Sequence, residues 1–224
     1  MSEILENRKE DLKRLSGGEY SRIEELIKEF NETIPSKDKT KLKSISQEAF
    51  PYEKKYIPLL PENEALSQKI GCETLLMTVG FQKEPIILSI LCLKPKNLIL
   101  LPTEETRRVA QEVENDPEVS ALKMKVFIIE ITESEATENY RLIKEKALVK
   151  AKGNIVIDPT AGRKIMVSSL ALVAFYYRLP MVYLHSIEKE GVTYPFSETL
   201  KLIENPFEFF GDKELEIIES QFNC

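Results

Sequence analysis

The sequence predicts an α/β fold of the Rossmann type, a mostly parallel sheet with helices on both faces, preceded by a short helical amino-terminal segment. From Cys72 onward, short apolar runs alternate with helical patterns, which is typical of strands joined by helical crossovers. These runs are apolar throughout rather than at alternate residues, so both faces of the strands are predicted to be buried. Buried parallel strands with crossovers favour a doubly wound sheet.

Strands are predicted at residues 74–79, 97–101, 126–131, 154–157 and 180–184. Helices are predicted between them, at residues 85–93, 103–113, 134–148 and 163–177. Thr103 would cap the second of these helices, and Ser134 or Glu135 would begin the third. A hairpin turn is predicted at residues 188–191 because Gly191 follows a charged run.

The amino-terminal part differs from the rest, so we assign residues 1–69 to a helical and irregular extension and residues 70–224 to the Rossmann-like domain. Two amphipathic helices are predicted first. Gly17-Gly18 ends the first helix, and Ser21 and Glu24 have the spacing of a capping box that opens the second.

Prolines at positions 51, 58 and 61 predict that residues 35–69 are mostly irregular. The basic run at residues 37–43 predicts either a solvated connector, which we favour, or a binding patch.

Composition excludes several classes of function. The net charge of -6 and a pI near 5.2 argue against a face that binds duplex DNA, because such binding depends on many Lys and Arg contacts to phosphate. No apolar run is long enough to span a membrane, and the amino terminus lacks a signal-peptide pattern. Three cysteines without metal-ligand spacing predict reduced thiols. We therefore expect a soluble, cytoplasmic protein without a metal or cofactor.

The catalytic inventory is small. His185, the single histidine, follows a predicted strand and has no visible nucleophile partner, so a strand-end hydrogen-bonding role is favoured over a catalytic triad.

The segment Asp158-Pro159-Thr160-Ala161-Gly162-Arg163-Lys164 stands between a predicted strand and a predicted helix. Gly162 allows close approach of a ligand to the backbone, the helix amino terminus offers unpaired N–H groups, and Arg163 and Lys164 add positive charge. This pattern predicts an anion site or an ordinary strand-to-helix turn with two solvated cations. It fits neither the dinucleotide fingerprint nor the P-loop.

Ligands of doubly wound sheets bind outside the carboxyl ends of the strands, near the point where the strand order reverses. Two further loops fall there, at residues 80–85 and 102–106. Phe81 in the first of them is predicted either to stack on a base or to pack in the core. Glu104 and Glu105 should stay at the rim, since carboxylates repel phosphates.

Four segments resemble the signature segments of the CARF domain, the CRISPR-associated Rossmann fold. They are residues 77–86 (MTVGFQKEPI), 91–101 (LCLKPKNLILL), 158–166 (DPTAGRKIM) and 205–212 (NPFEFFGD). The similarity covers about residues 71–222 and is closest to the sensor part of CARF-effector proteins of type III CRISPR systems. In such proteins the loop that corresponds to residues 158–164 usually carries two glycines, whereas Ala161 replaces the first of them here.

The resemblance implies a homodimer whose paired loops bind a cyclic oligoadenylate, either the tetra- or the hexa-adenylate. The expected ligand contacts are Gly80, Phe81, Gln82, Lys83, Thr103, Thr160, Ala161, Gly162, Arg163 and Lys164. Related proteins usually continue into an effector domain, whereas this chain stops at Cys224. We therefore expect either that an effector has been removed or that a partner protein supplies it.

Three functions remain open from the sequence. The chain is a signalling sensor, or a metal-independent ring nuclease that cleaves the ligand in the same pocket with Lys164 as its cation, or a scaffold with a vestigial loop.

Overall fold

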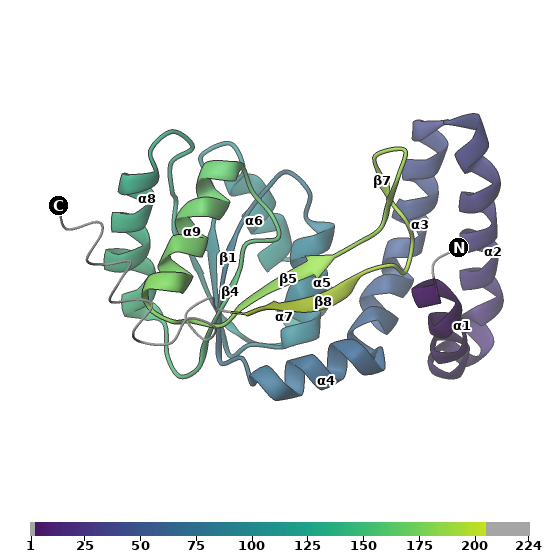
Figure 1. The fold of residues 1–224 in the computed structure, drawn as a ribbon, viewed down its shortest axis with the longest axis horizontal. Helices are drawn as coiled ribbons and strands as arrows, with labels where there is room; N and C mark the ends of the chain where they lie inside the picture. Colours follow the sequence, from purple (N-terminus) through teal and green to yellow (C-terminus); the bar gives the residue numbers. More distant parts are fainter. Residues whose placement is uncertain (1–2, 205–224) are drawn as a thin grey trace, which may run out of the picture.

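The computed structural model describes the backbone of residues 3–204, with side chains from residue 8 onward. Its centre is a six-stranded sheet with helices around it (Figure 1), and the strand order is β3-β2-β1-β4-β5-β8. The strands are β1 (Thr74–Thr78), β2 (Asn97–Leu101), β3 (Lys125–Ile128), β4 (Ile155–Asp158), β5 (Met181–His185) and β8 (Thr199–Ile203). The first five are parallel, and β8 joins β5 in the antiparallel direction. This order confirms the predicted Rossmann-type sheet.

Alternate residues of the central strands pack into two cores. Leu75 and Met77 belong to one core together with residues of α5 (Glu84–Leu93), α6 (Arg107–Glu114) and α7 (Pro117–Ala121). Leu76 and Ile157 belong to the other, together with residues of α8 (Ala136–Leu142) and α9 (Lys164–Tyr176). Burial on both faces is the reason that the inner positions of these strands are apolar on both sides of the sheet.

The extension consists of α1 (Glu3–Ser16), α2 (Tyr20–Thr33), α3 (Lys39–Tyr56) and α4 (Pro61–Ile70). Short 3-10 turns join them at Gly17–Glu19, Ile34–Ser36 and Ile57–Leu59. Their buried residues continue the core on the α5 side of the sheet. In Figure 1, α1, α2 and α3 lie at the end of the molecule that also carries β7.

The prediction that residues 35–69 are mostly irregular is therefore wrong. Leu42, Ile45 and Ala49 bury one face of α3, and the Asp38 carboxylate caps this helix by accepting a hydrogen bond from the Lys41 backbone N–H at 3.0 Å. Pro61 occupies the first turn of α4, where a missing N–H costs no helical hydrogen bond. Most of the basic run forms the start of α3 rather than a connector.

The predicted hairpin is confirmed, with β6 (Glu188–Lys189) pairing with β7 (Val192–Thr193) through a turn in which Gly191 has φ of 74°. The edge strand β8 was not predicted. Its sequence is too short to distinguish from a loop, and its burial comes from contacts with β5 and α4 that are distant in sequence. The third predicted helix ends early, because α8 passes into a π turn at Ile143–Ala147 and a 3-10 turn at Leu148–Lys150.

Two predicted caps are wrong. The helix α2 begins at Tyr20 with Glu19 as N-cap and no side-chain cap bond, so Ser21 lies inside the helix. Thr103 does not cap α6, which begins only at Arg107. The CARF-like segment at residues 205–212 lies outside the described residues.

The thiols of Cys72 and Cys92 are buried and free, and burial raises the pKa of each to about 12. They are therefore protonated at neutral pH, whereas Cys224 lies outside the described residues. Within residues 3–204, no helix combines the length and the apolar character needed to cross a membrane.

Candidate ligand site at the switch point of the sheet

The strand order places the reversal point between β1 and β4. From β1 the chain continues into α5 on one face of the sheet, and from β4 it continues into α9 on the other face. The loops that follow these two strands therefore flank a crevice at the carboxyl edge, where ligands of such sheets bind. These are the loops at residues 80–85 and 158–164, two of the three ligand loops predicted from the sequence.

The two loops touch through their backbones at two glycines. A Cβ on Gly80 would lie 2.9 Å from the backbone nitrogen of Gly162, a separation too short for any side chain. Gly162 has φ of +121°, and a Cβ on it would lie 3.0 Å from Cβ of Thr78. The Thr78 hydroxyl also donates a hydrogen bond to the Ala161 carbonyl. A side chain on Gly162 would thus point toward the end of β1 rather than toward a ligand.

A cavity of about 370 Å³, here named the loop cavity, opens at this contact. Its lining contains every predicted ligand residue except Lys83 and Lys164, and it also includes four residues that were not predicted. The full lining is Val79, Gly80, Phe81, Gln82, Pro85, Thr103, Thr106, Thr160, Ala161, Gly162, Arg163 and Met166. Of the residues not predicted as contacts, Pro85 and Thr106 lie within the predicted loops, whereas Val79 and Met166 lie just outside them and are identified by the three-dimensional arrangement.

The two predicted lysines lie outside the lining. Lys83 makes an ion pair with Glu112 of α6, with 3.2 Å between Nζ and Oε2. Lys164 is the first residue of α9, and its side chain is exposed without an ion pair or hydrogen bond in the described part of the chain. Its contact with a ligand stays a prediction.

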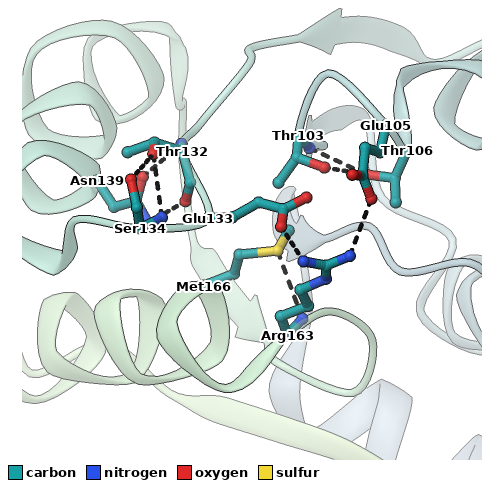
Figure 2. A network of polar contacts seen from close by, with 9 residues as sticks. All are labelled: Thr103, Glu105, Thr106, Thr132, Glu133, Ser134, Asn139, Arg163 and Met166. Atoms are coloured by element: carbon teal, nitrogen blue, oxygen red, sulfur yellow. Dashed lines mark hydrogen bonds and ion pairs between the residues drawn. The ribbon is translucent and has the colours of Figure 1, made fainter.

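Arg163, in the loop after β4, contacts the loops that follow β1, β2 and β3, and Figure 2 shows its bonds to the loops after β2 and β3. Its guanidinium donates to Glu105 after β2 at 2.9 Å and to Glu133 after β3. It also lies over the Phe81 ring after β1, with 5.6 Å between Cζ and the ring centroid. The positive charge of Arg163 is therefore matched by two carboxylates, and an anion that enters the loop cavity must compete with them.

Polar side chains hold these loops in place. Thr103 donates its backbone N–H to the Thr106 hydroxyl at 2.9 Å. The buried amide of Asn139 on α8 bonds both the N–H and the carbonyl of Thr132, each at 2.7 Å, which fixes the segment that carries Glu133 (Figure 2). A rigid frame of this kind reduces the entropy that ligand binding would cost.

Asp158 and Thr160 fix the loop after β4. The Asp158 carboxylate is fully buried and accepts hydrogen bonds from the N–H and the hydroxyl of Thr160. Burial raises the pKa of Asp158 above its ordinary value. The Thr160 hydroxyl in turn accepts from the Leu184 N–H at 2.9 Å, which ties this loop to β5.

Other predicted positions are located as follows. Phe81 is 62% exposed, so the core-packing alternative is wrong, while its stacking on a base stays a prediction. Glu104 and Glu105 are exposed and line no part of the loop cavity. His185 is the last residue of β5, where it pairs in register with Thr199, and its side chain is exposed.

No family model and no curated protein matches the chain. Solved structures do match parts of it. Can2 from Sulfobacillus thermosulfidooxidans in complex with cyclic tetra-adenylate is 16% identical over 50% of this chain and 32% of that chain, with a TM-score of 0.46. Csm6 from Enterococcus italicus bound to cyclic hexa-2′-fluoro-hexa-dAMP is 13% identical over 67% of this chain and 38% of that chain, with a TM-score of 0.41.

This chain thus spans 32% and 38% of the lengths of these two proteins. Because both TM-scores lie below 0.5, the fold assignment rests on the strand order of the sheet and not on these similarities.

Proposed function

We propose that this chain is a CARF-type sensor that binds a cyclic oligoadenylate across the loop cavities of a homodimer. The observation that supports the proposal most directly is the loop cavity itself. It lies at the switch point, next to the amino terminus of α9, and is lined by most of the residues that the CARF resemblance selects. Helix amino termini and glycine backbones are suited to phosphate groups.

The size of the cavity supports a dimer. A volume of about 370 Å³ is too small to enclose a ring of four nucleotides, so a ring would extend over the cavities of two chains. Tyr176 and Leu172 of α9 are 70% and 56% exposed, which leaves apolar surface for a second copy. Sedimentation should show a dimer at micromolar concentration, and a monomer with and without ligand would contradict this part of the proposal.

Ligand binding would then be passed on to an effector domain or a partner protein. The ion pairs of Arg163 offer the means, because a phosphate that replaces Glu105 or Glu133 releases the loops after β2 and β3.

The test is to incubate the purified protein with labelled cyclic tetra- and hexa-adenylate and to follow both retention and product. Linear oligoadenylate is the control ligand. Retention without cleavage supports the sensor, slow cleavage supports the ring-nuclease alternative, and failure to retain either ring contradicts both. Binding of the intact ring also tests the scaffold alternative, which predicts that the ring does not bind.

A further inference from the structure

A second cavity of about 430 Å³ adjoins the loop cavity. The two share Phe81, Gln82, Pro85 and Thr160 in their linings. Residues of β5 line the second cavity on one side, and α3 of the amino-terminal extension forms another of its walls through Phe50 and Glu53. Its lining also contains four glutamates, Glu53, Glu84, Glu188 and Glu198, and we name it the acidic cavity.

The charge of the acidic cavity selects against phosphate. Among the described residues, Lys43 is the one cation in its lining, against the four glutamates. The carboxylates of Glu84 and Glu188 would repel a phosphate there, whereas a group that donates hydrogen bonds would be favoured.

Glu198 provides the specific acceptor. Its side chain is only 4% exposed, and Oε2 has no hydrogen-bond partner in the described part of the chain. Glu53 beside it is also buried, but its Oε1 accepts from the Phe196 N–H at 3.0 Å. A buried acceptor without a donor is costly, so the free oxygen of Glu198 requires a donor that the described part of the chain does not supply.

The walls of the acidic cavity suit a flat ring. Phe81 and Tyr183 are exposed aromatic side chains in its lining, 62% and 40% exposed. Aromatic faces of this kind stack with bases. The amides of Gln47 and Gln82 also line it and can both donate and accept hydrogen bonds.

From these contacts we infer that the acidic cavity is the subsite for an amino-bearing nucleobase, whose exocyclic amino group donates to Glu198 while the attached phosphate lies in the loop cavity. In the proposed ligand this base is adenine, so the inference rests on the proposed function. It also gives the amino-terminal extension a role in ligand binding, because α3 carries one wall of the subsite.

The experiment compares adenosine with inosine, which has an oxygen in place of the 6-amino group. Ligand-observed NMR on the full chain measures both affinities, and calorimetry makes the same comparison with cyclic tetra-adenylate and its tetra-inosine counterpart. The wild-type protein should prefer the amino form about tenfold, the ratio expected when one buried acceptor loses its donor.

Two variants of Glu198 separate binding from folding. Glu198→Met keeps the length of the side chain but removes the acceptor, so the preference for the amino form should disappear. Glu198→Gln keeps a carbonyl oxygen and should retain the preference. Glu64→Gln, on the exposed face of α4, is the matched control and should behave as wild type.

Equal affinity for adenosine and inosine in the wild type, or an unchanged preference in Glu198→Met, would overturn the inference. A ring that binds without discriminating the amino group defeats the subsite and leaves the proposed function standing. A Glu198-dependent preference for adenosine without ring binding defeats the proposed function and leaves the subsite standing. If neither nucleoside nor ring binds, both are overturned.

Discussion

The loop cavity and the acidic cavity share a wall but differ in charge. The loop cavity has glycine backbones, the amino terminus of α9 and Arg163, whereas the acidic cavity has four glutamates and one lysine. A phosphorylated ligand placed across the two can therefore lie in only one orientation, with its phosphate toward the glycines. We infer that the difference in charge between the two linings, rather than the volume of either cavity, would select the ligand.

The largest expected effect comes from breaking the loop cavity alone. In Gly80→Val, the new side chain would meet the Gly162 backbone, whose nitrogen lies 2.9 Å from the first added carbon, and the two loops must separate. Binding of cyclic oligoadenylate should fall below detection in calorimetry. Gly18→Ala is the matched control, since nothing lies within 4 Å of the added carbon. Wild-type affinity in Gly80→Val would show that the contact between the loops does not form the site.

The acidic cavity should be the pH-sensitive one of the two. Burial raises the pKa of Glu198 from 4.5 to about 7, while its own backbone N–H and Arg8 oppose the shift. The pKa of Glu53 is also well above its ordinary value, because of burial, then Glu198 and, more weakly, Glu84.

The folded state holds these protons more tightly than the unfolded chain does. The free energy of unfolding should therefore be highest below pH 4.5 as far as this pair is concerned, and should fall as the pH rises through about 7. The loss for Glu198 is on the order of 3 kcal/mol. Urea unfolding of Glu198→Gln should show a flatter pH profile than the wild type, whereas Glu105→Gln should not. Identical pH profiles for wild type and Glu198→Gln would contradict a contribution of Glu198 to the pH dependence of stability.

Lys164 tests whether positive charge beside the loop cavity contributes to ring binding. Its ammonium is exposed at the start of α9 and free to turn toward a phosphate, so Lys164→Ala should weaken ring binding about tenfold, or about 1.4 kcal/mol, without lowering the melting temperature. Lys125→Ala, at the opposite edge of the sheet, should bind normally. Unchanged affinity in Lys164→Ala would make Lys164 a solvated surface residue.

The smallest effect is expected from the acids that hold Arg163. Glu133→Gln removes one of its two carboxylate partners, so ring binding should strengthen by roughly threefold and depend more steeply on salt. Glu130→Gln, whose partner is Arg107, is the control. Weaker binding in Glu133→Gln would mean that Glu133 orients Arg163 toward the ligand instead of competing with it.

The sheet and its ligand loops could be predicted because their signals are local. Apolar runs such as Asn97–Leu101 identify buried strands, and parallel strands must bring the loops at Gly80 and Gly162 to one edge. The sequence does not predict α3, because a proline such as Pro51 usually breaks a helix, whereas Pro51 lies on the exposed face of α3.

The acidic cavity could not be predicted at all. Glu53 and Glu198 are 145 positions apart in sequence, and nothing local indicates that either carboxyl is buried. The same holds for Arg163, whose partners Glu105 and Glu133 come from two other loops. Charge compensation of this kind depends on tertiary contacts that a single sequence does not encode in its spacing.

Calorimetric titration of the wild-type protein with cyclic tetra- and hexa-adenylate tests the central claim most directly. We expect that at least one ring binds, with a stoichiometry of one ring for two chains, and that linear oligoadenylate binds more weakly. Absence of binding for both rings, or equal affinity for the linear form, would contradict it.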